Sequence, residues 1–170
     1  GSHHEAELRA AEAHHFNHDL GATRRRAGSL AAADLTALDD ATRGRIVRLA
    51  VRAEMMASIQ MGGGNIDVSA LVDFVAATTD DRERAQALQL LAECDLAGNH
   101  LDEALVHARE GLSHALRSGD QRTIGLAYAS VGFTHLTRSD LGRAEDAYQQ
   151  MHRSAAAAGD GWLVSEALSR

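Results

Sequence analysis

Aspartate recurs in this chain every 40 residues, and each recurrence falls at the end of a helical pattern: Asp40, Asp80, Asp120 and Asp160. Self-similarity at such a period is typical of a stacked array of short units, because one unit alone cannot bury its apolar face. Arrays of this kind present an extended surface and seldom carry out chemistry. The period therefore predicts a binding or scaffolding role.

Two consecutive segments carry the repeat most clearly, residues 82–117 and residues 122–157. When the first is shifted by 40 positions onto the second, apolar residues meet apolar residues and small residues meet small ones. We therefore expect the two segments to adopt the same structure. The matched pairs are Leu88 with Tyr128, Leu91 with Val131, Ala92 with Gly132, Leu96 with Leu136, Leu101 with Leu141, Ala104 with Ala144, and Ala108 with Tyr148.

Each of these segments contains two stretches with apolar residues at helical spacing. The stretches are separated at Gly98-Asn99 in the first segment and at Ser139-Asp140 in the second. Glycine and asparagine favour the end of a helix, while serine, asparagine and aspartate favour the cap of the next one. Each segment is therefore predicted to form a helical hairpin.

Small and aromatic residues stand where the two helices of such a hairpin approach each other. Midway along the first helix the small residues are Ala92 and Gly132, and early in the second helix they are Ala104 and Ala144. The aromatic residues are Tyr128 and Tyr148. This combination resembles the tetratricopeptide repeat, in which small residues allow the two helices to pack closely. The resemblance is strong over residues 81–159 and weak elsewhere.

The chain departs from the family pattern in two ways. It contains no proline, so Gly-Asp stands where the family usually has the proline that ends the second helix, and its period is 40 residues rather than about 34. A longer repeat of this kind resembles the one in bacterial LuxR-type ATPase regulators. The resemblance implies an all-α fold, a right-handed superhelical array of antiparallel helical hairpins that forms an α-solenoid.

The repeat continues upstream in a degraded form. Helical spacing over residues 42–61 and 68–78 predicts two helices, separated at Gly62-Gly63-Gly64, and residues 5–18 and 23–38 predict an earlier pair. We expect about four hairpins plus a final helix. The expected boundaries are degenerate repeats at 5–38 and 40–79, clear repeats at 81–119 and 121–159, and the start of a further helix at 161–170.

The chain opens with Gly-Ser-His-His and lacks an initiator methionine. This opening resembles the remnant of a cleaved affinity tag, so we exclude residues 1–3 and expect one helical-repeat domain over residues 4–170, cut from a longer protein. The single cysteine, Cys94, cannot form an internal disulfide. Together with the lack of a secretory signal and of a membrane-length apolar stretch, it predicts a cytoplasmic protein.

Acidic residues outnumber basic ones, and the net charge is −7 with neutral histidines. Such a surface repels phosphate backbones, so we predict no direct nucleic-acid binding by this segment and no membrane binding. Arg45, Arg48 and Arg52 form a local exception, since their spacing places them in one stripe on a helix. The stripe is predicted to receive a partner's carboxylates by bidentate pairing, or alternatively to be a solvated outer face.

Histidines provide the only candidate metal ligands. His14 and His18 stand four residues apart, a spacing that can place two imidazoles on one metal ion, but no further ligands accompany them. We therefore predict no native metal site and no cofactor. His100, His107 and His114 recur every seven residues along one helix, about 10 Å apart and too far to share an ion. They are interpreted as a partly exposed stripe, with pH sensing at an interface as the alternative.

No catalytic constellation is present in the sequence. Gly62-Gly63-Gly64 lacks the Gly-Lys-Ser/Thr of a phosphate-binding loop, and Cys94 stands in a helix between Glu93 and Asp95, whose charges disfavour a reactive thiolate. We predict that the chain is not an enzyme.

In arrays that this chain resembles, the first helix of each hairpin lines a concave groove. The resemblance places six residues in that groove: Gln86, Gln89, Glu93, Leu126, Ala129 and Phe133. Amide and carboxylate groups suit the backbone of an extended peptide, and Phe133 suits an apolar side chain. Alternatively, Phe133 packs on the neighbouring repeat.

Two functional hypotheses follow. The first is a protein-binding or inducer-binding segment of a multidomain bacterial transcriptional regulator, whose DNA-binding domain lies outside this chain. The second is a stand-alone adaptor or peptide receptor. The final helix around Trp162 presents an apolar face, so we also expect a homodimer through that end.

Overall fold

The computed structural model describes residues 2–16, 19–62 and 65–168, and over these residues the chain is all-α, without a strand. The predicted fold class is confirmed at this level. The chain contains two compact units, residues 1–78 and 79–170, within the stretch expected to form one domain. The division lies next to the seam that the sequence places between its second and third repeats. Each unit is described by itself.

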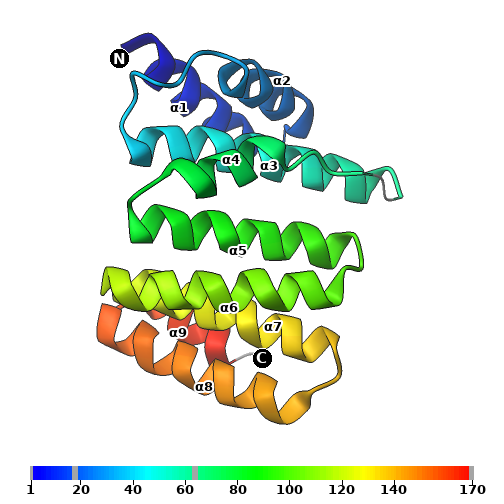
Figure 1. Ribbon diagram of the computed structural model, residues 1–170, viewed down its shortest axis with the longest axis vertical. Coiled ribbons are helices and arrows are strands. Elements are labelled where there is room, and N and C mark those ends of the chain that lie inside the picture. The colour runs from blue at the N-terminus through cyan, green and yellow to red at the C-terminus, as the bar shows by residue number, and fades with distance from the viewer. Residues whose placement is uncertain (1, 17–18, 63–64, 169–170) are drawn as a thin grey trace. The chain divides into compact units, whose positions relative to one another are not determined.

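The first unit contains α1 (Ser2–Phe16), α2 (Leu20–Ala31), α3 (Asp40–Gln60) and α4 (Ser69–Ala77), labelled in Figure 1. Helix α1 packs on α2 and α3, and α4 packs on α3. Helices α1, α2 and α3 bury a common apolar cluster, which consists of Leu8, Ala11, Ala27, Leu30, Ile46 and Leu49.

Helix α2 differs from the sequence expectation at both of its ends. It begins three residues early because the Asp19 carboxylate accepts a hydrogen bond from the Ala22 amide at 3.0 Å and caps the helix. It ends at Ala31 rather than at residue 38. Farther on, Asp34 accepts hydrogen bonds from both the amide and the hydroxyl of Thr36, a local turn that competes with helix.

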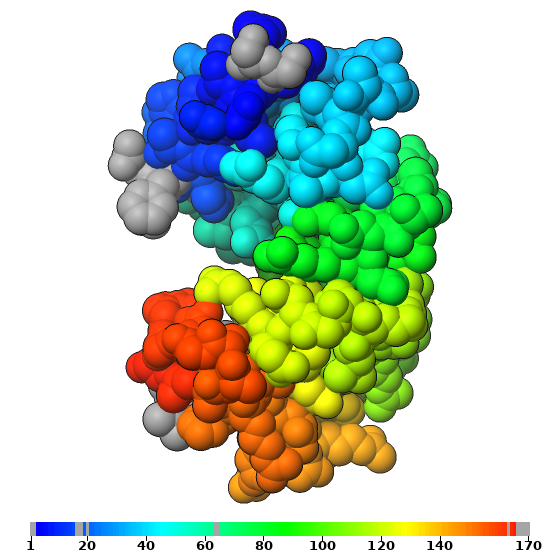
Figure 2. All heavy atoms as spheres, turned by 90° about the vertical axis from the view of Figure 1, so that its left-hand side faces the viewer, coloured from blue at the N-terminus to red at the C-terminus, as the bar shows by residue number. Residues whose placement is uncertain are grey.

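The second unit contains α5 (Asp81–Ala97), α6 (Leu101–Ser118), α7 (Gln121–Thr137), α8 (Leu141–Ala158) and α9 (Gly161–Leu168). Helices α5 and α6 form one hairpin, and α7 and α8 form the next (Figure 1). Helix α7 packs on both α5 and α6, and α9 packs in the same way on α7 and α8. The space-filling view shows α9, in red, against α8, in orange (Figure 2).

The aspartate repeat marks the seams between these elements. Asp80 caps α5 by accepting hydrogen bonds from the Arg82 and Glu83 amides, and Asp120 caps α7 by accepting one from the Thr123 amide at 2.8 Å. Asp160 directly precedes α9. At the first seam the cap is Asp39, one residue before the predicted position. Asp40 instead accepts a hydrogen bond from the Thr78 hydroxyl at 2.7 Å and so ties the start of α3 to the end of α4.

The turns also repeat between the two hairpins of the second unit. Gly119 and Gly159 follow α6 and α8 with φ of 69° and 66°, a conformation that glycine adopts without strain. Asn99 and Ser139 both have φ of 61° at the turn within each hairpin. Positive φ values at equivalent positions, 40 residues apart, support the sequence alignment of the two hairpins.

A glycine allows α7 and α8 to pack closely. A Cβ atom placed on Gly132 would lie 3.0–3.1 Å from three ring atoms of Tyr148. In the preceding hairpin the corresponding residues are Ala92 and Ala108, both fully buried. The two helices of the α7/α8 hairpin therefore pack through a glycine and a large ring, whereas the helices of the α5/α6 hairpin pack through two alanines at the same positions. Among the residues that the structure describes, no helix is long and apolar enough to cross a membrane.

Candidate functional site

The six predicted groove residues lie on one side of α5 and α7, but they differ in accessibility. Gln86 and Glu93 are half-buried, whereas Gln89 is 9% exposed. The Nε2 atom of Gln89 has no hydrogen-bond partner among the described residues. Phe133 is 44% exposed. The polar and aromatic groups at Gln86, Glu93 and Phe133 are therefore the ones that a partner can reach.

Leu126 and Ala129 have a structural role as well. Both are half-buried and pack against a cluster on α8, together with Val164 of α9. That cluster consists of Ala144, Tyr148, Met151 and Ala155. The two residues thus help to hold α8 and α9 on α7.

The predicted arginine stripe lies on α3. The Arg45 guanidinium donates to both carboxylate oxygens of Glu12 at 2.7 and 2.8 Å, so the bidentate acid expected from a partner is supplied here by α1 of the same unit. Arg48 is half-buried and Arg52 is exposed, and both also take part in interactions.

The histidine candidates separate into different environments. The Nδ1 atom of His14 lies 3.7 Å from a carboxylate oxygen of Asp19, and His18 lies outside the described residues. No group of three potential metal ligands occurs in the part of the chain that the structure describes.

Two members of the histidine series on α6 pair with acids of α5. Nδ1 of His107 lies 2.7 Å from Asp95, and Nδ1 of His114 lies 2.5 Å from Asp81, while His100 is exposed. The hydrogen bond with Asp95 raises the pKa of His107, and the hydrogen bond with His114 lowers the pKa of Asp81. These pairs fasten α5 to α6.

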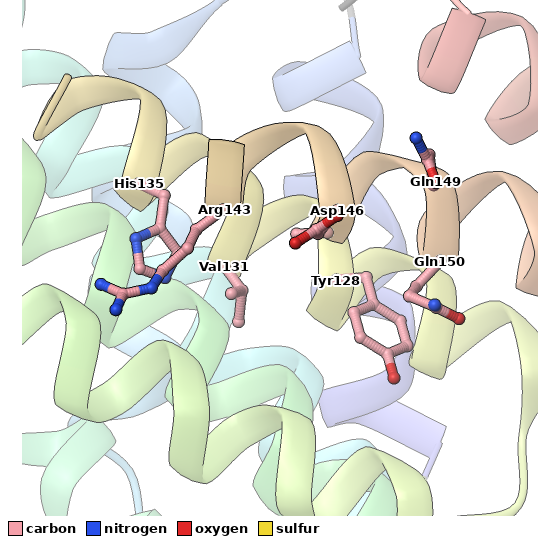
Figure 3. Close-up of a pocket in the computed structure, with 8 residues that line it drawn as sticks. Tyr128, Val131, His135, Arg143, Asp146, Gln149 and Gln150 are labelled. Atoms are coloured by element: carbon pink, nitrogen blue, oxygen red, sulfur yellow. The ribbon is translucent and has the colours of Figure 1, made fainter. Parts of the chain in front are cut away.

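A pocket of about 370 Å³ opens between α7 and α8, and the sequence analysis did not predict it. Its lining consists of Tyr128, Val131, His135, Arg143, Asp146, Ala147, Gln149 and Gln150. In Figure 3, His135 and Arg143 lie at one end, Tyr128 and Gln150 lie at the other, and Val131 and Asp146 lie between them. The lining therefore combines apolar side chains with polar and charged ones, including the Asp146 carboxylate between the two ends.

His135 is the unusual residue of this pocket. It is 3% exposed, and its buried Nδ1 makes no hydrogen bond with the described residues. A carboxylate oxygen of Asp140 lies 3.5 Å from Nδ1, within ion-pair range but outside hydrogen-bond geometry, and the same oxygen accepts a hydrogen bond from Arg143 at 3.0 Å. The Nδ1 atom of His135 therefore has a nearby acid but no hydrogen-bond partner.

Burial determines the protonation state of His135. Loss of solvent lowers the pKa of the ring, Asp140 opposes this effect, and the neighbouring positive charges of Arg109, Arg143 and Arg138 reinforce it. The ring is consequently neutral at neutral pH, which makes one nitrogen a hydrogen-bond donor and the other an acceptor.

The sequence did contain a signal for this pocket, in the positions where the repeats differ. At a shift of 40 residues, Asp95 and His107 correspond to His135 and Ala147. The acid and the histidine that form a hydrogen bond in one hairpin are thus replaced by a histidine and an alanine in the next.

A scan of family models finds no match to this sequence, and a search of curated proteins finds no significant relative.

Proposed function

We propose that this chain is a non-catalytic, partner-binding module of the tetratricopeptide-repeat type, arranged as a right-handed superhelix of hairpins. One observation carries the proposal: in the second unit α7 packs on α5, the first helix of the hairpin before it, and α9 packs in turn on α7. Stacking of equivalent helices generates a continuous surface along the array, which is the surface that repeat proteins use for binding.

The accessible side chains of that surface favour an extended peptide as the ligand. Gln86 and Glu93 offer an amide and a carboxylate to peptide backbone groups, and the exposed ring of Phe133 offers contact area to an apolar side chain. Alternating polar and apolar contacts of this kind suit a strand-like segment. The role proposed for these residues is binding.

In its wider context, we propose that the module is the sensor or interaction segment of a multidomain bacterial transcriptional regulator. The 40-residue period and its Gly-Asp seams support this proposal through their resemblance to the long repeats of such regulators. The alternative is a stand-alone adaptor or peptide receptor. A gene that encodes this chain next to a helix-turn-helix or nucleotide-binding domain would favour the regulator, and one that encodes the helical repeats alone would favour the adaptor.

Selection of peptides from a displayed library of random linear sequences on the full chain tests the binding surface. Binding of selected peptides should weaken about tenfold in Glu93→Arg and in Phe133→Ala, because each removes a contact worth on the order of 1.4 kcal/mol. The matched controls are Glu145→Arg and Val106→Ala, which make the same kinds of change at exposed positions on α8 and α6. Equal binding by the test variants and the controls would refute the assignment of this surface.

A further inference from the structure

The two hairpins of the second unit differ most sharply around one position. In the first hairpin, the His107 ring pairs with Asp95 at 2.7 Å, and three acids act on its charge. These acids are Asp95, Glu110 and Glu103, and all three raise the pKa of His107. This position is therefore a protonatable base surrounded by carboxylates.

The second hairpin inverts this arrangement. At a shift of 40 residues the three acids Asp95, Glu103 and Glu110 become His135, Arg143 and Gln150, and the central His107 becomes Ala147. All four replacements line the α7/α8 pocket. The pocket thus lies where the preceding hairpin has the His107 imidazole. His135, Arg143 and Gln150 place hydrogen-bond donors at the positions of its three acids, while Asp146, at the position of Val106, adds one carboxylate to the lining.

The donors at the end of the pocket that holds His135 and Arg143 have unused capacity. The Nδ1 atom of His135 makes no hydrogen bond with the described residues although the residue is 3% exposed, and its nearest acid, Asp140, lies 3.5 Å away. Arg143 donates to Asp140 through one terminal nitrogen, and its side chain is 68% exposed. A guanidinium has five N–H donors, so several remain for a ligand.

We propose that the α7/α8 pocket binds a carboxylate group through His135 and Arg143, in the role that Asp95 fills for His107 in the preceding hairpin. Tyr128 and Val131 would contact the body of the ligand, and Gln150 would provide a further polar contact. A volume of about 370 Å³ suits a small organic acid or an acidic side chain of a peptide.

This site is separate from the proposed peptide surface. Val131 and His135 follow Ala129 and Phe133 by two residues on α7, and two residues correspond to about 200° around a helix. The two sites therefore lie on opposite sides of α7, and the carboxylate site does not depend on the proposed peptide-binding role.

Titration of ¹⁵N-labelled protein with glutarate, followed by NMR, tests the proposal. Glutarate should shift the signals of His135 and Arg143 saturably, whereas its neutral analogue glutaramide should leave them unchanged. A parallel titration with the acetylated, amidated dipeptide Glu-Glu distinguishes the source of the carboxylate. Saturation by either acid supports the site, the stronger ligand identifies the source, and failure of both to saturate overturns the proposal.

Charge reversal locates the binding to the pocket. Arg143→Glu should weaken binding of the better acid about tenfold or more, since it removes a charge-assisted hydrogen bond. Arg153→Glu makes the same change at an exposed position of the same helix and should leave the affinity unchanged, apart from the shared effect of net charge. Equal weakening in the two variants would show that only net charge matters and would overturn the site.

A pocket-filling variant supplies an independent test. The double substitution His135→Asp with Ala147→His rebuilds the pair that Asp95 and His107 form. The acid again stands on the first helix of the hairpin and the histidine on the second. The double substitution should abolish acid binding while the far-UV circular dichroism stays helical. In the unmodified chain, the bound acid should also raise the pKa of His135, which is measured from its ring C–H signals. The Asp140 carboxylate acts in the same direction, whereas the positive charges of Arg109, Arg138 and Arg143 lower this pKa. Binding that survives the double substitution would contradict the assignment.

Discussion

Gly132→Ala tests the packing on which the second hairpin depends. The added Cβ would lie 3.0 Å from Cε1 and 3.1 Å from Cδ1 and Cζ of Tyr148, closer than the 3.5–4.0 Å or so at which carbon atoms attract. The ring cannot easily move aside, because Tyr148 is 8% exposed and belongs to the cluster that includes Met151 and Ala155.

Two opposing effects determine the size of the change. Replacing glycine by alanine inside a helix gains about 1 kcal/mol of backbone propensity, while forcing an extra methyl group into a packed core costs about 1–3 kcal/mol. We expect the steric cost to be larger, so that Gly132→Ala lowers the free energy of unfolding by about 1 kcal/mol.

Gly142→Ala is the matched control. Gly142 is an exposed residue in the first turn of α8, and a Cβ atom there would meet nothing within 4 Å. This variant should gain about 0.5 kcal/mol through its backbone alone. Urea unfolding followed by far-UV circular dichroism gives both values on one scale, with the m-value as a check on cooperativity.

A double substitution isolates the contact itself. Gly132→Ala combined with Tyr148→Ala recreates the Ala92 and Ala108 pair of the preceding hairpin, in which the small side chains are fully buried. Without the ring, the alanine at position 132 should no longer destabilise, giving a coupling energy of about 1 kcal/mol or more. A Gly132→Ala variant as stable as Gly142→Ala would refute the packing argument.

Two further predictions concern the charged groups of the second unit. The hydrogen bond with Asp95 raises the pKa of His107 above its ordinary value of 6.5. The stabilisation by the protonated ring is therefore complete below the unfolded-state pKa and is lost as pH rises through the folded-state pKa. Urea midpoints measured from about pH 6 to pH 9 should show this loss in the parent chain and a smaller one in His107→Gln. Asp120→Ala removes the acceptor of the Thr123 amide and hydroxyl and should cost about 1 kcal/mol in the same assay, with Asp120→Asn retaining most of the cap. Because these hydrogen bonds lower the pKa of Asp120, the cap is lost as pH falls through that pKa, and Asp120→Ala should be less sensitive to acid than the parent chain.

The helices of the second unit could be predicted from the sequence because the repeat presents the same pattern twice. Asn99 and Ser139 occupy matching positions and differ in residue type, yet both have φ of 61°. A single occurrence of Ser139 in this conformation would have been a poor turn signal. The turn was predicted because serine and aspartate at positions 139 and 140 both favour the cap of a helix.

The first unit lacks this redundancy, and its helix ends were harder to predict. Consecutive aspartates at positions 39 and 40 both suit a helix cap, and periodicity favoured Asp40. Tertiary contact decided otherwise, because the Asp40 carboxylate pairs with Arg43 at 2.5 Å and with the buried Thr78. Asp39 remains free to cap α3 through Thr42. Periodicity alone does not contain this long-range contact.

Resemblance between repeats also concealed the α7/α8 pocket. Matching apolar with apolar residues selects the positions that hold the hairpin together, such as Leu91 and Val131, and passes over those that differ. A stacked array can tolerate such differences because each hairpin is held by its own core and its neighbours. In this unit the His107 and Asp95 pair strengthens one hairpin. In the next, Ala147 lines the pocket beside His135, whose Nδ1 atom has no hydrogen-bond partner among the described residues. Loss of an internal pair costs stability locally, and the adjacent core of Ala144, Tyr148 and Met151 can compensate for it. We therefore expect binding sites in such arrays at positions where one repeat lacks a polar pair that its neighbour has, while the apolar core of that repeat is kept.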